Sequence, residues 1–232
     1  MPHGTPDWGL IGPISVLYGL DDLAEHAVRA GAVSSWDRIG HVVFQDNFKE
    51  GTGAWYSIVS SADGTVCPFT ETALSPPFCI RLVNGSGGAT YARMRHYLSY
   101  GYRGQVGLEC SVAYGPDIEY IKFGIFSSLP TGRQLFYVRL TPATGDLDHG
   151  SDGVGWTNFA NVGVLGGNIW QWRHVKMVVD FTTGLFVRFV FLGVVYDMAG
   201  IACDAMVALA PWHWYVMIEN DSSTADQYIL HL

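Results

Sequence analysis

The sequence predicts an all-β protein, an antiparallel sandwich of two sheets, and three observations support this prediction. Its most apolar stretch, residues 168–200, alternates between two faces with a period of two. Ten further stretches show strand patterns and are separated by Gly, Pro, Asn, Asp or Ser clusters, which gives about a dozen strands in all. The 232-residue chain also holds 28 Gly, 12 Phe, 12 Tyr and 8 Trp, a composition that suits many short strands joined by tight turns.

The stretch NIWQWRHVKMVVDFTTGLFVRFVFLGVVYDMAG is apolar enough to suggest a membrane span, but charges interrupt it. Arg188 and Asp197 leave no run of about 20 apolar residues, which a spanning helix needs. A period of two fits better, and one face then holds Val175, Met177, Val179, Phe181, Val187, Phe189 and Phe191. Turns at residues 182–184 and 192–193 divide the stretch, so we expect consecutive antiparallel strands over residues 171–199.

Other stretches of the chain show the same strand pattern. They are HVVFQ, AWYSIV, CIRLV, ATYARMRHYL, QVGLECSVAY, EYIKFGIFS, RQLFYVRL, WTNFANVGVL, WHWYVMIEN and QYILHL. Their spacing is that of a two-sheet sandwich, which we assign to residues 41–232.

Residues 1–40 differ from the rest and form a separate N-terminal region. They begin with a Gly- and Pro-rich extended arm, and LDDLAEHAVRAG then predicts one short helix, capped by Asp21 or Asp22 and ended by Gly31. The arm carries too much apolar surface to stay in water, so it packs along its own domain or reaches a neighbouring subunit. The second alternative predicts a homo-oligomer or a larger protein assembly.

Charge and cysteine content narrow the function classes. The net charge of -8, with no cluster of Lys and Arg, argues against nucleic acid and anionic membranes as partners. The opening MPHGTPDWGLIGP lacks the features of a secretory signal peptide, so secretory export is not expected. The cysteines show no zinc-type spacing, and no cofactor is expected. Cys67 and Cys79 flank a Pro-rich loop and are either bridged or free.

Three segments resemble concanavalin A-like jelly rolls of the laminin-G and lectin type. FQDNFKEGTGAWYS is similar to the family's "DDFEDG…W" opening, WRHVKMVVDFTTGLFVRFVFLGVVYDMAG to its "WHHVKLVVDFDTGKYVRFYVDGKEYDLSG" meander, and YVMIENDSSTADQYILHL to its closing strands. The resemblance covers roughly residues 43–232 and implies the fold more than an activity. It also implies that Trp55 and Trp172 pack inside. Where many relatives end in an acidic "yiDDi", this chain has Tyr228, Ile229, Leu230 and His231, so the resemblance implies no calcium site there.

Glycoside hydrolases of this fold carry acids at alternate positions of one strand, in an ExDxxE pattern. The segment PDIEYIKF comes nearest, since Asp117 and Glu119 share a face, but the third acid is replaced by Lys122. We therefore interpret the segment as a solvated strand edge. No catalytic residue is predicted, and the chain is expected not to be an enzyme.

The segment ATGDLDHGSDGVGW offers weak candidates for a Ca²⁺ site, Asp146, Asp148 and Asp152. Their spacing departs from the EF-hand pattern because Gly150 takes the third ligand position and no Glu follows in the required place. A hydrated turn is the favoured interpretation, and no metal site is predicted.

Aromatic residues are the remaining signal for binding. Trp8, Trp156 and Trp170 lie beside glycine turns and are the candidates for exposure, as a platform for sugar rings or as a subunit interface. The alternative for any tryptophan is core filling.

Three hypotheses about function follow. The favoured one is a noncatalytic structural protein, such as a decoration, capsid or fibre component of a virus or phage particle, self-associating through the N-terminal arm. The alternative is a carbohydrate-binding, lectin-like module. The third is a glycan-cleaving enzyme, which the incomplete acid pattern disfavours.

Overall fold

The computed structural model of the chain describes residues 44, 46, 48, 51–73, 78–86, 89–98, 104–116, 118–129, 132–151, 153–206, 213–222 and 229–231. The predicted arm and helix, the boundary near residue 40, Trp8, Asp117 and Asp152 lie outside these residues and stay predictions. The sandwich belongs to a compact unit that runs from residue 48 to residue 232. No helix in the described residues has the length and apolar character that a membrane crossing requires.

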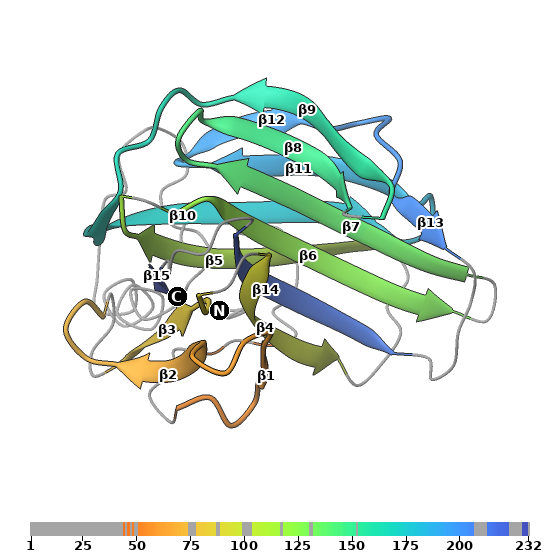
Figure 1. The fold of residues 1–232 in the computed structure, drawn as a ribbon. Helices are drawn as coiled ribbons and strands as arrows, with labels where there is room; N and C mark the ends of the chain where they lie inside the picture. Colours follow the sequence, from red (N-terminus) through yellow and green to blue (C-terminus); the bar gives the residue numbers. More distant parts are fainter. Residues whose placement is uncertain are drawn as a thin grey trace, which may run out of the picture. The chain divides into compact units, whose positions relative to one another are not determined.

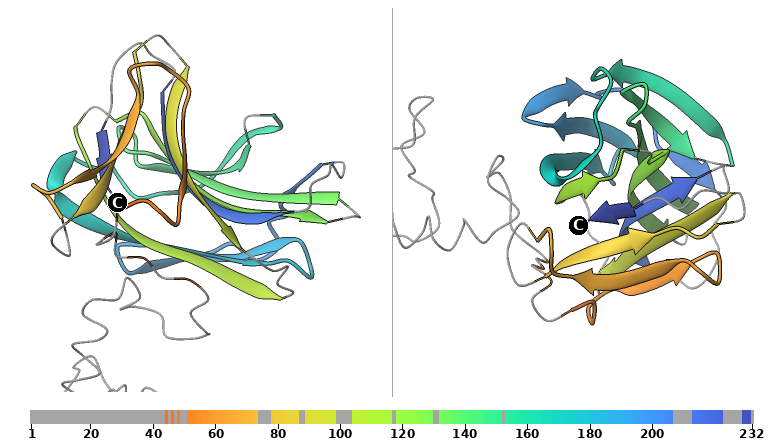
Figure 2. Two further views of the ribbon diagram at one scale, coloured as in Figure 1. Left: turned by 90° about the horizontal axis from the view of Figure 1, so that it is seen from below. Right: turned by 60° about the vertical axis from the view of Figure 1, so that its left-hand side comes forward.

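The described residues form two antiparallel sheets that are stacked face to face (Figures 1 and 2). The first is eight-stranded, with the order β1 (Tyr56–Val59), β4 (Thr90–Leu98), β14 (Trp214–Ser222), β6 (Tyr120–Leu129), β7 (Gly132–Thr141), β8 (Asp146–Ser151) and β9 (Gly155–Asn161), and with β13 (Asp204–Met206) paired to β7. The second is seven-stranded, with the order β12 (Val194–Asp197), β11 (Leu185–Phe191), β10 (Asn168–Asp180), β5 (Gln105–Tyr114), β15 (Ile229–His231), β3 (Cys79–Val83) and β2 (Thr65–Phe69). The prediction of an all-β sandwich is confirmed.

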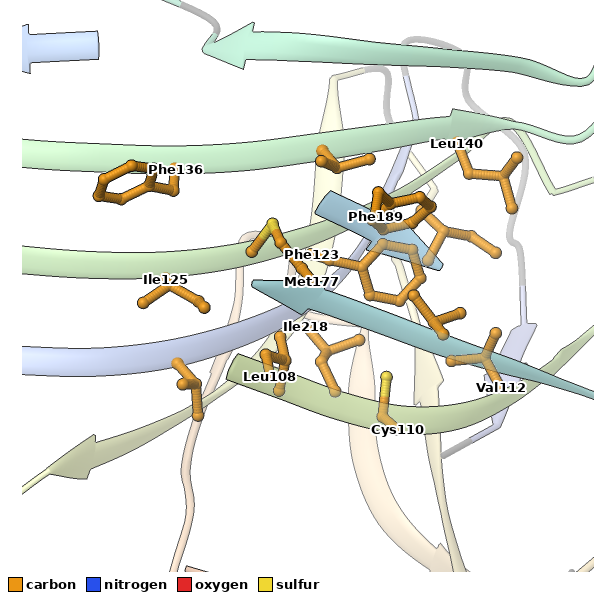
Figure 3. Packing of buried hydrophobic residues seen from close by; sticks show 14 of the residues in the cluster. Leu108, Cys110, Val112, Phe123, Ile125, Phe136, Leu140, Met177, Phe189 and Ile218 are labelled. Carbon is orange, nitrogen blue, oxygen red and sulfur yellow. The ribbon is translucent and has the colours of Figure 1, made fainter. Parts of the chain in front are cut away.

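The core lies between the two sheets because the strands alternate apolar side chains with other residues. Phe123, Ile125 and Phe136 of the eight-stranded sheet are fully buried against Met177 and Phe189 of the seven-stranded sheet. Figure 3 shows these side chains pointing toward one another, together with Leu108, Cys110, Val112, Leu140 and Ile218. Burial of each large apolar side chain contributes about 1.5–3 kcal/mol, so this layer holds the sheets together.

The apolar meander is the antiparallel ladder that its pattern predicts, with β10, β11 and β12 joined by turns at residues 181–184 and 192–193. The predicted faces of β11 are wrong at one place. A register shift sets Val178 opposite Arg188 but Val179 opposite Phe186, so Val187 is an extra residue that has no opposite partner in β10. The bulge turns Phe186 into the core in place of Val187, and the regular pattern returns at Phe189.

Three strands of the sandwich, β2, β8 and β13, lie outside the predicted stretches. Residues 65–69, TVCPF, overlap the predicted Pro-rich loop between Cys67 and Cys79 but form β2, at the edge of its sheet. Pro68 lacks a backbone N–H, and an edge strand tolerates this loss because one side of it has no neighbour to bond. Asp146–Ser151, taken as a hydrated turn, forms β8. Cys67 and Cys79 are both free, on neighbouring strands whose register offsets them by two residues.

Replacing Phe189 by Ala tests how far the sandwich depends on this core. We expect the free energy of unfolding to fall by about 3–5 kcal/mol because the substitution leaves a cavity between the sheets. Urea unfolding followed by circular dichroism measures it. Val164→Ala is the control, since Val164 is 76% exposed and surface changes usually stay within about 0.5 kcal/mol. Equal losses in the two variants would contradict the assignment of the core.

Candidate functional site

The eight-stranded sheet has an outer face, turned away from the second sheet, and β14 shows how the sequence divides between the two faces. Val216 and Ile218 belong to the core, and Asn220 donates a hydrogen bond of 3.3 Å to the carbonyl of Leu82 in the other sheet. The alternate residues Tyr215, Met217, Glu219 and Asp221 therefore lie on the outer face. Strand register extends this assignment to the neighbouring strands.

One row of polar and charged side chains crosses the outer face from strand to strand. The register sets Glu219 opposite Arg93 and Lys122, Lys122 opposite Arg139, and Arg139 opposite Asp148. We call these five residues the charged row. A sheet face buries such groups at low cost only where each charge meets an opposite one, and the distances show that it does.

Ion pairs bind the charged row together. The Glu219 carboxylate lies 2.6 Å from Nε of Arg93 and 3.4 Å from Nζ of Lys122, which also lies 2.5 Å from the Asp221 carboxylate. Arg139 donates two hydrogen bonds, of 3.2 and 2.7 Å, to Oδ2 of Asp148. Lys122 is only 4% exposed and Glu219 only 2% exposed. Because these groups are desolvated, loss of one partner would cost far more than a surface pair would.

Glu219 is a titratable group whose pKa this environment perturbs. Burial raises its pKa above the usual carboxyl value, and the nearby positive charges of Arg93 and Lys122 oppose that shift without cancelling it. A carboxyl group of this kind keeps its proton to a higher pH than an exposed glutamate.

A pocket of about 460 Å³ opens above the charged row. Its charged lining consists of Arg93, Lys122, Arg139, Glu219 and Asp221. The remaining lining residues are Ala89, Tyr91, Tyr120, Trp156 and Ser222. A smaller cavity of about 70 Å³ adjoins it, and Tyr137 and Met217 line this cavity together with members of the charged row. The pocket thus combines aromatic rings with several groups that can donate or accept hydrogen bonds, which is the composition of a binding site for a polar ligand.

Cation–π contacts hold the aromatic rings of the pocket in place. The guanidinium carbon of Arg139 lies 4.5 Å from the ring centroid of Trp156 and 4.8 Å from that of Tyr120. Nζ of Lys122 lies 5.5 Å from the Trp156 ring, and Arg93 lies 3.6 Å from the ring of Tyr91. Each contact contributes about 0.5–2 kcal/mol, so the rings are positioned before any ligand arrives.

Beyond the pocket the same face becomes aromatic. Tyr97, Tyr215 and Phe126 stand opposite one another on neighbouring strands, and the rings of Phe126 and Tyr215 stack at 4.5 Å. Tyr137 connects this group to the pocket, since its hydroxyl lies 3.4 Å from that of Tyr215. Its ring lies over Gly124, where an added Cβ would stand 2.3 Å from the ring. Gly124 therefore makes room for Tyr137.

The acidic residues considered for metal or catalysis lie in different settings. Asp146 and Asp148 share a face of β8, where Asn158 donates hydrogen bonds of 3.4 and 3.2 Å to them. Asp148 is also paired with Arg139, and Asp146 accepts a hydrogen bond of 2.7 Å from Asn161. Glu119 accepts a hydrogen bond of 3.0 Å from Ser222 at the edge of the pocket. The described residues contain no group of three or more acids, histidines or cysteines suited to a metal.

The described candidate tryptophans lie in different parts of the structure. Trp156 lines the pocket, whereas Trp170 is 63% exposed on β10 of the other sheet. Trp55 packs partly against the core. Trp172 is half-buried, and its indole N–H donates a 3.0 Å hydrogen bond to the carbonyl of Thr72. Only Trp156 joins the charged residues.

The acids of this site were not predicted because the expected acid pattern lies within a single strand. The segment around Lys122 was interpreted as a solvated edge, but β6 lies inside the sheet between β14 and β7. The acids come from β14, in WYVMIENDS, where Glu219 and Asp221 stand at alternate positions. That alternation, and the alternate Arg93 and Arg95 in YARMRHYL, were visible signals. The order of the strands, which brings them together, was not.

Known structures share this architecture, although no protein-family model and no curated protein matches the chain. The endo-β-1,4-glucuronan lyase of the fungus Trichoderma reesei is similar with a TM-score of 0.56 and 11% identity, over 77% of this chain and 88% of that one. A carbohydrate esterase of the Shiga toxin-encoding bacteriophage phi24B has a TM-score of 0.51 and 12% identity, over 79% and 90%. A sialidase has a TM-score of 0.51 and 11% identity, over 80% of this chain but 17% of that one. At these identities the similarity shows the fold, which is the concanavalin A-like jelly roll that the sequence resembles.

The prediction that the chain is not an enzyme is contradicted. The lyase and the esterase, which match over 88% and 90% of their own length, are named as glycan-processing enzymes, so this sandwich is a fold on which such chemistry occurs. The prediction rested on acids missing from one strand, and β14 supplies two acids to the pocket instead.

Replacing Gly124 by Ala tests the packing of Tyr137 over β6. The added Cβ must displace the ring, so we expect a loss of about 1–3 kcal/mol in the free energy of unfolding. Gly107→Ala on β5 is the matched control, because a Cβ there meets its nearest atom at an ordinary 3.4 Å. In a Tyr137→Ala background the Gly124→Ala change should cost much less. Equal costs in both backgrounds would show that the ring does not depend on Gly124.

Proposed function

We propose that the chain is a carbohydrate-active protein that binds a glycan in the pocket on the outer face of the eight-stranded sheet. The observation that carries the proposal is the position of Trp156. Its ring forms part of the pocket above Arg139 and Lys122, beside the Glu219 and Asp221 carboxylates. A sugar ring has an apolar C–H face and a rim of hydroxyl groups, so it can lie on the indole while its hydroxyls bond to the charged row.

The fold supports the same proposal. The similar structures are named as a glucuronan lyase, a carbohydrate esterase and a sialidase, whose names refer to carbohydrate substrates. A shared fold alone does not fix an activity, so the similarity counts only together with the pocket. Of the hypotheses drawn from the sequence, the carbohydrate-binding one is better supported than assembly of a virus or phage particle.

Replacing Trp156 by Ala tests the proposal. We expect the affinity for a glycan that binds the wild-type chain to fall at least tenfold, which corresponds to about 1.4 kcal/mol. A glycan array identifies the ligand, and isothermal titration calorimetry then measures affinity. Trp170→Ala serves as the comparison because it removes an exposed indole from the other sheet. If Trp170→Ala abolishes binding and Trp156→Ala does not, the binding site lies on β10 instead.

A second candidate function, glycan cleavage, is favoured by the buried carboxyl group of Glu219. With its pKa raised by burial, Glu219 can act as a general acid that transfers its proton to the glycosidic oxygen. The bond from that oxygen to the anomeric carbon then breaks, water adds to the carbon, and the proton that this water loses returns to the Glu219 carboxylate. Asp221 lies beside it on the same strand face, 2.5 Å from Nζ of Lys122.

Replacing Glu219 by Gln tests the proton transfer. Gln has nearly the same shape but no acidic proton, so we expect the rate of reducing-end release to fall at least 100-fold while the glycan still binds. The wild-type rate should decrease as the pH rises through the raised pKa of Glu219, because the donor loses its proton there. Glu109→Gln, on the seven-stranded sheet, is the control and should keep the wild-type rate. A wild-type rate in Glu219→Gln would exclude this residue as the proton donor.

A further inference from the structure

Two arginines on the outer face of the eight-stranded sheet lie outside the charged row. Arg95 on β4 places its guanidinium carbon 4.7 Å from the ring centroid of Tyr215. Arg133 on β7 lies 5.9 Å from the ring of Phe126. Among the described residues, neither has a carboxylate within ion-pair distance, and the buried Nε of each has no hydrogen-bond partner. Each can therefore direct its charge toward a ligand.

These arginines differ from the cations of the pocket. Arg93 and Lys122 are balanced by Glu219 and Asp221, and Arg139 is balanced by Asp148. The aromatic part of the face thus carries two positive charges without such a partner, in a chain whose net charge is -8. The guanidinium groups lie over rings and are oriented before binding, and a planar guanidinium matches the geometry of a carboxylate or sulfate group.

The two arginines are continuous with the pocket. Tyr137 lines the smaller cavity and reaches Tyr215, whose ring stacks on Phe126. Along β4, Tyr91 lies in the pocket and Tyr97 is six residues away, which is about 20 Å in an extended strand. Tyr97 is 45% exposed and so presents an aromatic surface at that distance. A ligand that touches both ends has to be a chain of several sugar rings.

We propose that the glycan bound at this site is an acidic polysaccharide, whose chain extends from the pocket onto the aromatic part of the face, where Arg95 and Arg133 bind its carboxylate or sulfate groups. This inference rests on the proposed function. Single-stranded nucleic acid also combines charge with stacking, but it carries a charge on every nucleotide and binds through clustered Lys and Arg. Two separate arginines in a strongly acidic chain fit the wider spacing of acidic groups on a sugar chain better.

The experiment compares acidic polysaccharides with matched ligands that lack the charge or the length, and with a single-stranded nucleic acid. The probes are polygalacturonate and dextran sulfate, their uncharged counterparts methyl-esterified polygalacturonate and dextran, a digalacturonate, and a single strand of thymidylate. Affinity is measured by calorimetry for the wild type, Arg95→Gln, Arg133→Gln and the double variant. Arg81→Gln removes one charge from the seven-stranded sheet and is the matched control.

We expect the double variant to lose at least tenfold in affinity for an acidic polymer and to change little toward the uncharged polymers and the digalacturonate. Added salt should weaken the wild-type binding of the acidic polymer more than that of the double variant, since it screens the arginines. Comparison of polygalacturonate with dextran sulfate identifies the acidic group. Circular dichroism verifies that each variant is folded, and the salt dependence of the wild type tests the proposal without any variant.

Several outcomes would overturn the inference. Equal affinity for the charged and uncharged polymers, no effect of the double variant, or an equal loss in Arg81→Gln would each remove the role of Arg95 and Arg133. Tighter binding of thymidylate than of both acidic polysaccharides would identify a nucleic-acid site instead. Binding of uncharged glycans alone overturns the acidic class but keeps the proposed function, whereas binding of no glycan at all overturns both.

Discussion

The burial of Glu219 is the constraint on which the arrangement of the outer face depends. Glu219 is 2% exposed and lies on a sheet face that no described strand covers, so the neighbouring strands must supply charge that compensates its carboxylate. Arg93 and Lys122 do so from either side, and Lys122 in turn requires Asp221. The charged row therefore acts as one unit. Its ion pairs fix the floor of the pocket, and its cations fix the rings above that floor.

The pocket and the aromatic part of this face differ in how their charges are compensated. In the pocket the charges are balanced and desolvated. Their ion pairs therefore fix the positions of the side chains but produce little net electrostatic field. In the aromatic part, stacked rings bury one another and leave the guanidinium groups of Arg95 and Arg133 uncompensated. Tyr137 joins the two parts and is accommodated only because residue 124 has no side chain. Gly124 thus allows the pocket and the aromatic part of the face to form one continuous surface.

The sequence predicted the fold well because alternation is a local property. The alternation of Val175, Met177 and Val179 assigns these residues to one sheet face without knowledge of any other strand. The turn at residues 182–184 can likewise be predicted from its own residues. The candidate site could be predicted only in part. Trp156 was identified from its glycine neighbours, but Glu219, Lys122 and Arg139 come from three strands far apart in sequence, and only the order β14, β6, β7 places them side by side. The bulge at Val187 was also not predictable, since two alternating stretches without a partner strand leave their mutual register open.

Because of the bulge in β11, the meander tolerates the loss of a residue better at position 187 than elsewhere in its strands. Removal of one residue from a regular strand moves every following side chain to the opposite face. Removal of Val187 leaves the following side chains on their present faces. Phe186 then precedes Arg188 directly, and these two residues already lie on opposite faces. Homologous chains can therefore lose or gain a residue at this position without exchanging core for surface. An alignment with a chain that lacks this bulge would need a gap at residue 187 before the apolar positions of the two meanders correspond.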